Sequence, residues 1–248
     1  MNDSTRRTFN HSMLSSLLTY SVLETLFMGD VLADAIKPVA ASWLSDVNEQ
    51  SFDLKAKVLT ATQWQKQVEK LMDKVNLPDL LKFIDFEKLK ATVKLQDRGE
   101  KSFRGRFPEV EGLPSRLVFG HQIFGIKKGA SVVPHGHNNM ATAFLILQGN
   151  FHGRHYDRLE DTETHMVIKP TINDTFEPGG CSTISDEKDN VHWFKGNSDV
   201  GYIFNIHVMN VKSGPTGRVY IDPDGEKLSD GRINAKRISS QVAFNKFG

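Results

Sequence analysis

The sequence predicts a mainly β domain, a sandwich or small barrel, preceded by an α-helical appendage. From residue 116 onward the chain consists of short apolar runs separated by turn residues such as Lys128-Gly129 and Pro178-Gly179-Gly180. Many short strands with regular turns are typical of sandwiches and barrels. Before residue 95 the apolar residues instead recur at steps of three and four, which indicates helices. We therefore place the helical region at 36–95, the β domain at 105–222 and a polar tail at 223–248.

The composition excludes several classes of partner and site. The 248 residues carry a formal net charge of +1 and include a single cysteine, Cys181. Because no basic stripe stands out, nucleic acid is not expected as a partner. One cysteine excludes an intramolecular disulfide and a cysteine-based zinc cluster, and we interpret Cys181 as a half-buried structural residue. No stretch of the sequence is long and apolar enough to span a membrane.

The first 35 residues allow two interpretations. Arg6-Arg7 stands in a segment, TRRTF, that fits a twin-arginine export signal, and the apolar run Met13–Leu23 and small residues at 33–35 follow it. This interpretation, which we favour, places the protein in the periplasm. The alternative is an amphipathic helix of a cytoplasmic protein, because Glu24 and Asp30 interrupt the apolar run.

The helical region divides into three segments. Residues 38–60 have a weak helical pattern, and Gln63–Val75 has a stronger one with apolar residues at three- and four-residue steps. Pro78 fits the first turn of a third helix, Asp79–Val93. The charged segment 96–112, which contains glycine and proline, is interpreted as a linker.

Nine strands are expected after the linker, and the tail after Asp222 is expected to follow the surface. The strands are Arg116–Ile126, Val132–Pro134, Ala141–Leu147, Phe151–Tyr156, His165–Lys169, Asp174–Phe176, Val191–Phe194, Val200–Met209 and Arg218–Ile221.

The segment SVVPHGHNNMATAFLILQGNFHGRHYDR, residues 131–158, contains the strongest chemical signal. Its histidines His135 and His137 are two residues apart, so in an extended chain both point to the same side and can reach one metal ion. Neutral imidazoles suit iron, zinc, copper and nickel. His192, in the segment NVHWFKG, is the best candidate for a third ligand.

This combination resembles the cupin double-stranded β-helix, in which an HxH on a strand is followed by a glycine turn and a later histidine before an aromatic residue. The usual cupin motif has a glutamate a few residues after the HxH, where this chain has Thr142. Without this carboxylate, the chain resembles a cupin subgroup that has three histidine ligands. The resemblance implies a jelly-roll barrel with a metal site at His135, His137 and His192.

Within that subgroup the chain resembles the thiol dioxygenases, specifically the cysteamine dioxygenase and plant cysteine oxidase group. Those proteins carry a segment like HxHPGMTVFxKLLYGxxHxxSYDW, and residues 135–158 read HGHNNMATAFLILQGNFHGRHYDR without a gap. A second family motif like NIHxFxA corresponds to residues 190–196. The identical positions in the first segment, besides the two histidines of the HxH, are Met140, Gly149, His152, Tyr156 and Asp157.

The resemblance implies a non-haem Fe(II) enzyme that converts a thiol and O₂ to a sulfinate, with Zn, Mn or Ni as other metals. Its substrate would be a small thiol or a peptide with an N-terminal cysteine. His152 and Tyr156, expected on one strand face, are candidate pocket groups. Asn205 stands where the family has an aspartate, and Asn138-Asn139 replace a Pro-Gly. Cupins commonly pair through sheet edges, so a homodimer is also expected.

Two other functions remain open at this point. A metal-binding cupin without turnover, acting as a sensor or small-ligand module, is favoured by Asn205, because an asparagine cannot act as a base. A Zn or Mn cupin isomerase or hydrolase is the third hypothesis. His152, His155 and His207 are interpreted as hydrogen-bonded structural histidines rather than ligands, and His121 and His165 as turn or surface residues.

Overall fold

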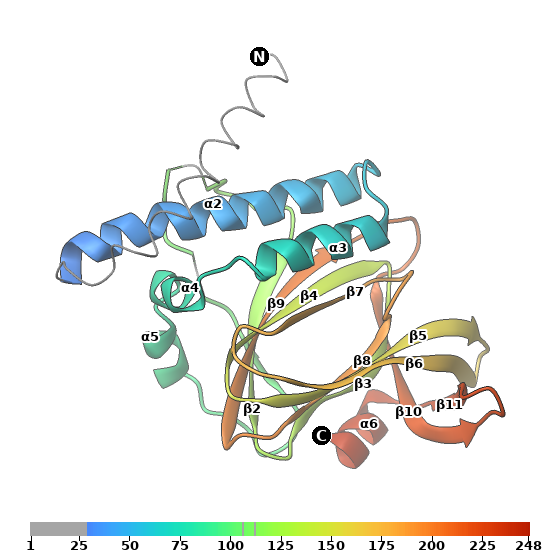
Figure 1. Ribbon diagram of the computed structural model, residues 1–248. Coiled ribbons are helices and arrows are strands. Elements are labelled where there is room, and N and C mark those ends of the chain that lie inside the picture. Colours follow the sequence, from blue (N-terminus) through green and yellow to red (C-terminus); the bar gives the residue numbers. More distant parts are fainter. Residues whose placement is uncertain (1–28, 106, 112) are drawn as a thin grey trace.

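The computed structural model describes residues 29–105, 107–111 and 113–248 of the chain (Figure 1). The mainly β architecture predicted for a cupin-like chain, a barrel with an N-terminal helical region, is confirmed. Arg6-Arg7 and the apolar run after it lie outside the described residues, so the export signal stays a prediction. Residues 33–35, the expected cleavage site, lie inside the helix α2 (Gly29–Lys55). No helix within the described ranges has both the length and the apolarity needed to cross a membrane.

The β domain consists of two antiparallel sheets. The first has five strands in the order β1 (Lys101–Phe103), β2 (Gly120–Lys127), β9 (Val200–Met209), β4 (Met140–Gln148) and β7 (Cys181–Ile184). The second closes on itself in the order β10 (Gly217–Lys227), β11 (Ile233–Arg237), β6 (His165–Phe176), β5 (Phe151–Asp161), β8 (Val191–Gly196) and β3 (Ser131–Asn138).

The helices cover the outer face of the five-stranded sheet. Helix α2 and the helix α3 (Ala61–Met72) lie across β9, β4 and β7 (Figure 1), and one apolar cluster joins them to the sheet. Side chains alternate along a strand, so every second residue of β4 and β9 points to this cluster. The strand residues concerned are Ala141, Ala143, Leu145, Leu147, Tyr202, Phe204, Ile206 and Val208. Each large side chain buried there contributes about 1.5–3 kcal/mol of hydrophobic stabilisation.

The third predicted helix is divided in two. Helix α4 (Leu77–Phe83) starts with a proline in its first turn, as expected, and helix α5 (Phe86–Ala91) follows it. Between them Asp85 has a φ of 49°, a left-handed conformation that aspartate adopts more readily than most residues. The break redirects α5 so that the Phe86 ring packs against Tyr202, with 5.2 Å between centroids. The prediction of one continuous helix was wrong because it followed local periodicity and could not include this tertiary contact.

The inner faces of the two sheets enclose an interior with an apolar end and a polar end. The apolar end is a cluster that includes Phe144 on β4, Phe151 on β5 and Phe194 on β8. Further along the same faces the interior residues become polar, and we call this part the polar end: His135, His137, Thr142, His155, His192, Asn205 and His207, all buried. Gly149 has a φ of 75° in the turn between β4 and β5, a conformation that favours glycine.

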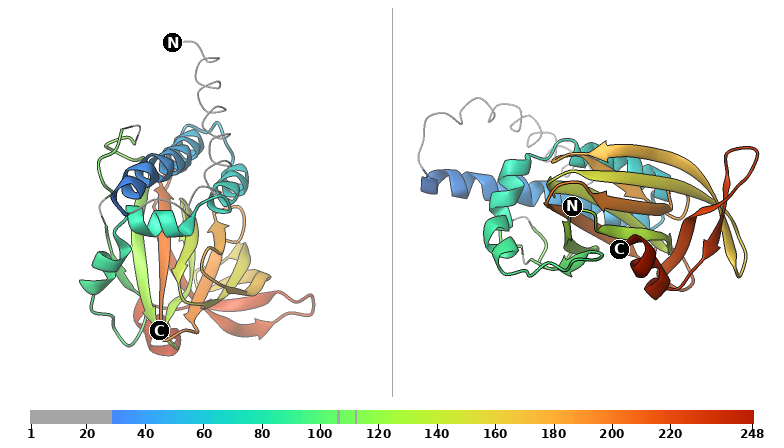
Figure 2. Two further views of the ribbon diagram at one scale, coloured as in Figure 1. Left: turned by 60° about the vertical axis from the view of Figure 1, so that its left-hand side comes forward. Right: turned by 90° about the horizontal axis from the view of Figure 1, so that it is seen from below.

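The sheet extends past both expected limits of the β domain. The predicted linker contributes β1, and the tail contributes the second half of β10, then β11 and the helix α6 (Ser240–Phe247). Helix α6 packs Ala243 and Phe247 against Val133 on the outer face of β3, on the far side of the barrel from α2 and α3 (Figures 1 and 2). The tail therefore supports the strand that carries the HxH pair.

Candidate metal centre

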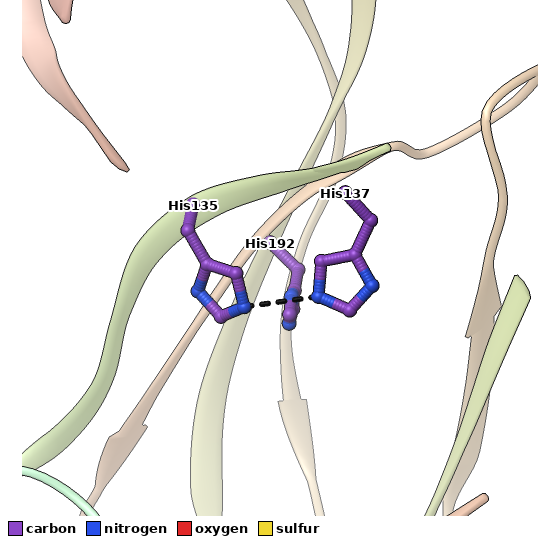
Figure 3. Close-up of side chains that lie close together, drawn as sticks. All are labelled: His135, His137 and His192. Carbon is purple, nitrogen blue, oxygen red and sulfur yellow. Dashed lines mark hydrogen bonds between the residues drawn. The ribbon is translucent and has the colours of Figure 1, made fainter. Parts of the chain in front are cut away.

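Strand pairing brings the three predicted ligands together. His135 and His137 lie on the inner face of β3, and β3 pairs with β8 so that His135 stands opposite His192. The His192 ring centroid lies 4.3 Å from that of His135 and 5.1 Å from that of His137. One nitrogen from each of the three rings can be chosen so that all lie within 4.8 Å of one another. Figure 3 shows the three rings gathered at one point of the interior.

A backbone carbonyl determines which ring nitrogen of His135 carries the proton. Its Nδ1 lies 2.7 Å from the carbonyl oxygen of Val133, which can only accept, so Nδ1 carries the proton. The Nε2 atom of His135 is then an unprotonated acceptor, and it lies 3.0 Å from Nε2 of His137 (Figure 3). A metal-binding histidine commonly donates its other ring N–H to a carbonyl in this way.

His192 provides the observation that best fits a metal. Its side chain is 1% exposed, and neither ring nitrogen has a hydrogen-bond partner among the residues that the structure describes. Leaving a buried polar group without a partner costs about 1–3 kcal/mol. A metal ion bound by His135, His137 and His192 would satisfy one of these nitrogens, so the residues present fit such an ion.

The electrostatic surroundings keep the three imidazoles neutral. Burial lowers the pKa of His135 to about 3, with a further contribution from the charge of Arg218. Burial also places the pKa of His137 and of His192 well below 6.5, and the neighbouring histidines and Arg218 add to the effect. Neutral imidazoles offer a lone pair at neutral pH, which is the form that a metal requires.

Thr142 stands where the usual cupin motif has a glutamate, and the structure shows its role in the interior. Its side chain is fully buried, and its hydroxyl oxygen lies 3.3 Å from Nδ1 of His137 and 3.3 Å from Nδ1 of His207. The residue therefore contacts a candidate ligand from behind instead of adding a carboxylate to the site.

The two other candidate pocket groups lie elsewhere in the structure. The His152 side chain is partly exposed, and its Nε2 contacts the side-chain oxygen of Asn173 at 2.7 Å. Tyr156 packs in an apolar cluster with Met166 and Ile168, and a β-bulge separates it from His155. The structure does not bring either residue to the three histidines, and their assignment to catalysis stays a prediction.

Asn205 does lie at the polar end. It is 1% exposed and stands opposite Gln122 on β2 and Phe144 on β4. Its side-chain oxygen has no hydrogen-bond partner within the described part of the chain. The position therefore faces the interior, with an amide where the resembling family has a carboxylate.

The Asn138-Asn139 pair forms the turn that ends the HxH strand. Asn139 has a φ of 56°, a left-handed conformation that glycine adopts easily and asparagine tolerates. Its side-chain amide donates to the carbonyl of Gly214 at 2.7 Å. Asparagine can thus take the place of the family's glycine here without losing the turn.

Two features of the site were missed from the sequence. His155, interpreted as a hydrogen-bonded structural residue, is fully buried opposite His192, and neither of its nitrogens has a partner among the described side chains and backbone. Its position on the inner face could have been found, because it alternates in step with the apolar Phe151. His207 was interpreted as a hydrogen-bonded structural residue, and its contacts with Thr142 and Gln122 agree with that interpretation.

The second missed feature is the segment expected to be a linker. Glu100 lies in it and pairs with Arg218 at 3.4 Å, and the Glu100 side chain is only 8% exposed. Arg218 stands opposite His137 on the neighbouring strand. Burial raises the pKa of Glu100, and Arg218 opposes this effect. A charged segment gives no periodic signal, so the sequence could not show that it lies beside the site.

Cys181 is outside the site, as expected for a structural residue. Its sulfur lies 3.5 Å from a carboxylate oxygen of Asp73. Burial and this carboxylate raise the thiol pKa to about 12, so the reactive thiolate is not populated at neutral pH.

Comparisons with known proteins give little beyond this geometry. No protein-family model matches the chain, and no curated protein matches it significantly. Among solved structures, procruciferin, an 11S globulin from Brassica napus, aligns at a TM-score of 0.31 and 11% identity, covering 41% of this chain and 23% of its own. An 11S globulin from Wrightia tinctoria aligns at 0.31 and 9% identity, covering 41% of this chain and 22% of its own. Because both TM-scores are low, the description of the fold rests on the strand order and pairing of this chain.

Proposed function

We propose that this protein is a metal-binding cupin in which His135, His137 and His192 hold one divalent ion. The observation that carries the proposal is the pair of buried, unpartnered nitrogens of His192 beside the unprotonated Nε2 of His135. Three histidines from two paired strands supply the donor set, and burial keeps them neutral.

We further propose that the ion is iron(II) and that the protein is a thiol dioxygenase. Three neutral ligands leave the full dipositive charge on the ion, which favours an anionic partner such as a thiolate. Bound iron(II) would supply the redox chemistry with dioxygen. In the overall reaction, RSH + O₂ gives RSO₂H, so both oxygen atoms join the sulfur, which loses the four electrons that O₂ gains. The match of residues 135–158 to the family segment supports this choice.

The residues around the ligands would bind and orient the substrate. Asn205 offers an unpartnered amide oxygen to the interior, and His155 offers a neutral ring with one donor and one acceptor. An amide can orient a substrate by hydrogen bonds but cannot take its proton, so the thiol proton would have to leave to another group. The apolar cluster around Phe144 and Phe194 limits access of water from the other end of the interior.

The second candidate function is a metal-dependent binding module without turnover. Asn205, in place of a carboxylate, favours it, because the site then has no acid or base on β9 at that position. A zinc or manganese isomerase or hydrolase is the third candidate, and the identity of the bound metal distinguishes it from the first.

Oxygen uptake by the iron-loaded protein distinguishes these candidates. The protein would be loaded with iron(II) anaerobically and tested with cysteine, cysteamine, 3-mercaptopropionate and a peptide with an N-terminal cysteine. We expect uptake with one class of thiol, loss of uptake in His135→Ala, and unchanged uptake in His165→Ala, a histidine on β6 that contacts Thr164. A fully iron-loaded protein that consumes no oxygen with any thiol would contradict the dioxygenase and favour the binding module.

Periplasmic export and a homodimer remain proposals. Replacing Arg6-Arg7 by Lys-Lys should retain the protein in the cytoplasm, as measured by fractionation, whereas a chain that keeps its first residues and is never exported would contradict the export signal. Sedimentation of the purified protein would test the dimer, and a single species with the mass of one chain, 27.9 kDa, would contradict it.

A further inference from the structure

A chain of hydrogen-bonding side chains runs from the metal centre to the surface. It begins at His137 and continues through Thr142 and His207. His207 Nε2 then lies 2.6 Å from Nε2 of Gln122, and the Ser102 hydroxyl lies 2.5 Å from Oε1 of Gln122. The first three residues are buried and Ser102 is exposed. The five side chains lie on β3, β4, β9, β2 and β1. The series of hydrogen bonds therefore starts on β3 of the second sheet and continues across four strands of the five-stranded sheet.

The direction of the hydrogen bonds follows from the Val133 carbonyl. His135 Nδ1 must donate to it, and an imidazole with a single N–H then has an unprotonated Nε2. His137 Nε2 lies 3.0 Å from that atom and must therefore donate to it. A neutral imidazole has one N–H, so Nδ1 of His137 is an acceptor. Thr142 then donates its hydroxyl proton to His137 and accepts from Nδ1 of His207.

The contacts at the surface end of this series, between His207, Gln122 and Ser102, agree independently with this direction. If His207 donates through Nδ1, its Nε2 is an acceptor, because burial lowers its pKa to about 3 and keeps it neutral. The Gln122 atom next to it is Nε2, a donor, and the Gln122 oxygen accepts from Ser102. Every contact from Ser102 to Val133 thus joins one donor to one acceptor.

Metal binding is incompatible with this direction. An ion bound by His135 and His137 through the facing Nε2 atoms needs a lone pair on both, whereas the hydrogen-bond direction derived above places a proton on His137 Nε2. His137 must move its single proton to Nδ1, which then donates to Thr142. Thr142 must donate to His207 Nδ1, and His207 must carry its proton on Nε2. The Gln122 amide must turn its oxygen toward His207. Both rings keep one proton, so protons are redistributed without net release from this chain.

We propose that Thr142, His207 and Gln122 are positioning residues that reverse their hydrogen bonds when a metal binds and so couple the protonated nitrogen of His137 to the surface at Ser102. The inference rests on the metal binding proposed above. Thr142 supplies a hydroxyl where the usual cupin motif has a carboxylate. A hydroxyl can donate to His137 when no metal is bound and accept from His137 when a metal is bound. Asp or Glu at this position, when ionised, could only accept.

Nitrogen-15 NMR of the histidine rings tests the proposal with Zn(II) as a diamagnetic probe. In the metal-free wild-type chain we expect His207 to carry its proton on Nδ1, and with one equivalent of Zn(II) on Nε2. His207→Gln assigns the His207 signals. In Thr142→Val, which keeps the shape and removes the hydroxyl, the His207 tautomer should no longer respond to Zn(II), and Zn(II) affinity should fall by about 10–100-fold, the usual effect of losing such a partner.

A buried threonine with different partners provides the matched control. Thr183 on β7 is buried opposite Ala143 and donates to Glu69 at 2.6 Å. Thr183→Val should leave both the Zn(II) affinity and the His207 response as in the wild type. A His207 ring with the same tautomer with and without bound Zn(II) would overturn the proposal. If no Zn(II) binds, the metal site itself is contradicted, while the metal-free tautomers of His137 and His207 still test the direction of the chain.

Discussion

At the scale of residues, the polar end combines histidines whose nitrogens are fully satisfied with histidines whose nitrogens are not. His207 contacts Thr142 and Gln122 through its two nitrogens. His155 is equally buried, yet neither nitrogen has a partner among the described residues. Removing one partner of a buried hydrogen bond leaves the other unsatisfied, which costs about 1–3 kcal/mol, whereas removing a polar group without partners has no such cost.

This contrast predicts that the same substitution destabilises the protein at one histidine and not at the other. His207→Leu should lower the free energy of unfolding of the metal-free protein by about 1–3 kcal/mol, because Thr142 and Gln122 lose a partner. His155→Leu, of similar volume, should leave it unchanged within about 1 kcal/mol. Urea denaturation of the three proteins measures both effects. Equal destabilisation by the two variants would mean that His155 has a structural partner.

At the scale of elements, the ligand positions depend on strands from distant parts of the chain. Strand β3 pairs with β8 on one side and with β10 on the other, and α6 packs on its outer face through Phe247 and Ala243. The Ser131 hydroxyl also donates to the carbonyl oxygen of Phe247. The C-terminal helix therefore supports the strand of His135 and His137.

Removing the side chain through which α6 packs on β3 should therefore lower the stability of the whole β domain. Phe247→Ala should destabilise the protein by about 3 kcal/mol, the usual cost of removing a buried aromatic ring. Val242, 47% exposed on the same helix, provides the control, and Val242→Ala should change stability by less than about 0.5 kcal/mol. Thermal unfolding of the two variants measures the difference. A tail that only followed the surface, as expected from its composition, would give two equal and small effects.

The features of the site that the sequence predicts are those that depend on neighbouring residues of one strand. The two-residue spacing of His135 and His137 and the aromatic context of His192 were sufficient to predict the cluster, because strand geometry places alternate residues on one face. The choice of His152 over His155 was not supported by the geometry, since it followed a family position and did not use the alternation with Phe151. The pairing of Glu100 with Arg218 and the contacts of α6 join segments far apart in sequence, and composition carries no information on such pairings.

At the scale of the whole molecule, the buried histidines make stability depend on pH. An unfolded histidine has a pKa near 6.5, whereas in the folded chain burial lowers the pKa of His135 and His207 to about 3 and that of His155 to about 4. Between these values the unfolded chain binds protons that the folded chain does not. Stability therefore rises with pH in this window, is complete above about 6.5 and falls as the pH drops toward 4.

We expect the free energy of unfolding of the metal-free protein, measured by urea denaturation, to fall steadily from pH 6.5 to pH 4.5, with a slope of up to about 1.4 kcal/mol per pH unit for each histidine that stays neutral. His155→Leu should reduce that slope by up to about 1.4 kcal/mol per pH unit, the contribution of one proton. A flat profile, or an unchanged slope in the variant, would show that these rings are accessible to protons in the folded state.

The stoichiometry of bound metal tests the central claim most directly. The purified full chain would be stripped with a chelator, titrated with Zn(II) and with iron(II) under anaerobic conditions, and its metal content measured by mass spectrometry. We predict one ion per chain in the wild type and in His165→Ala, and less than about one tenth of an ion in His135→Ala, His137→Ala and His192→Ala, because two histidines rarely retain an ion. Full occupancy in the His192→Ala variant, or no binding by the folded wild-type chain, would contradict a three-histidine metal centre.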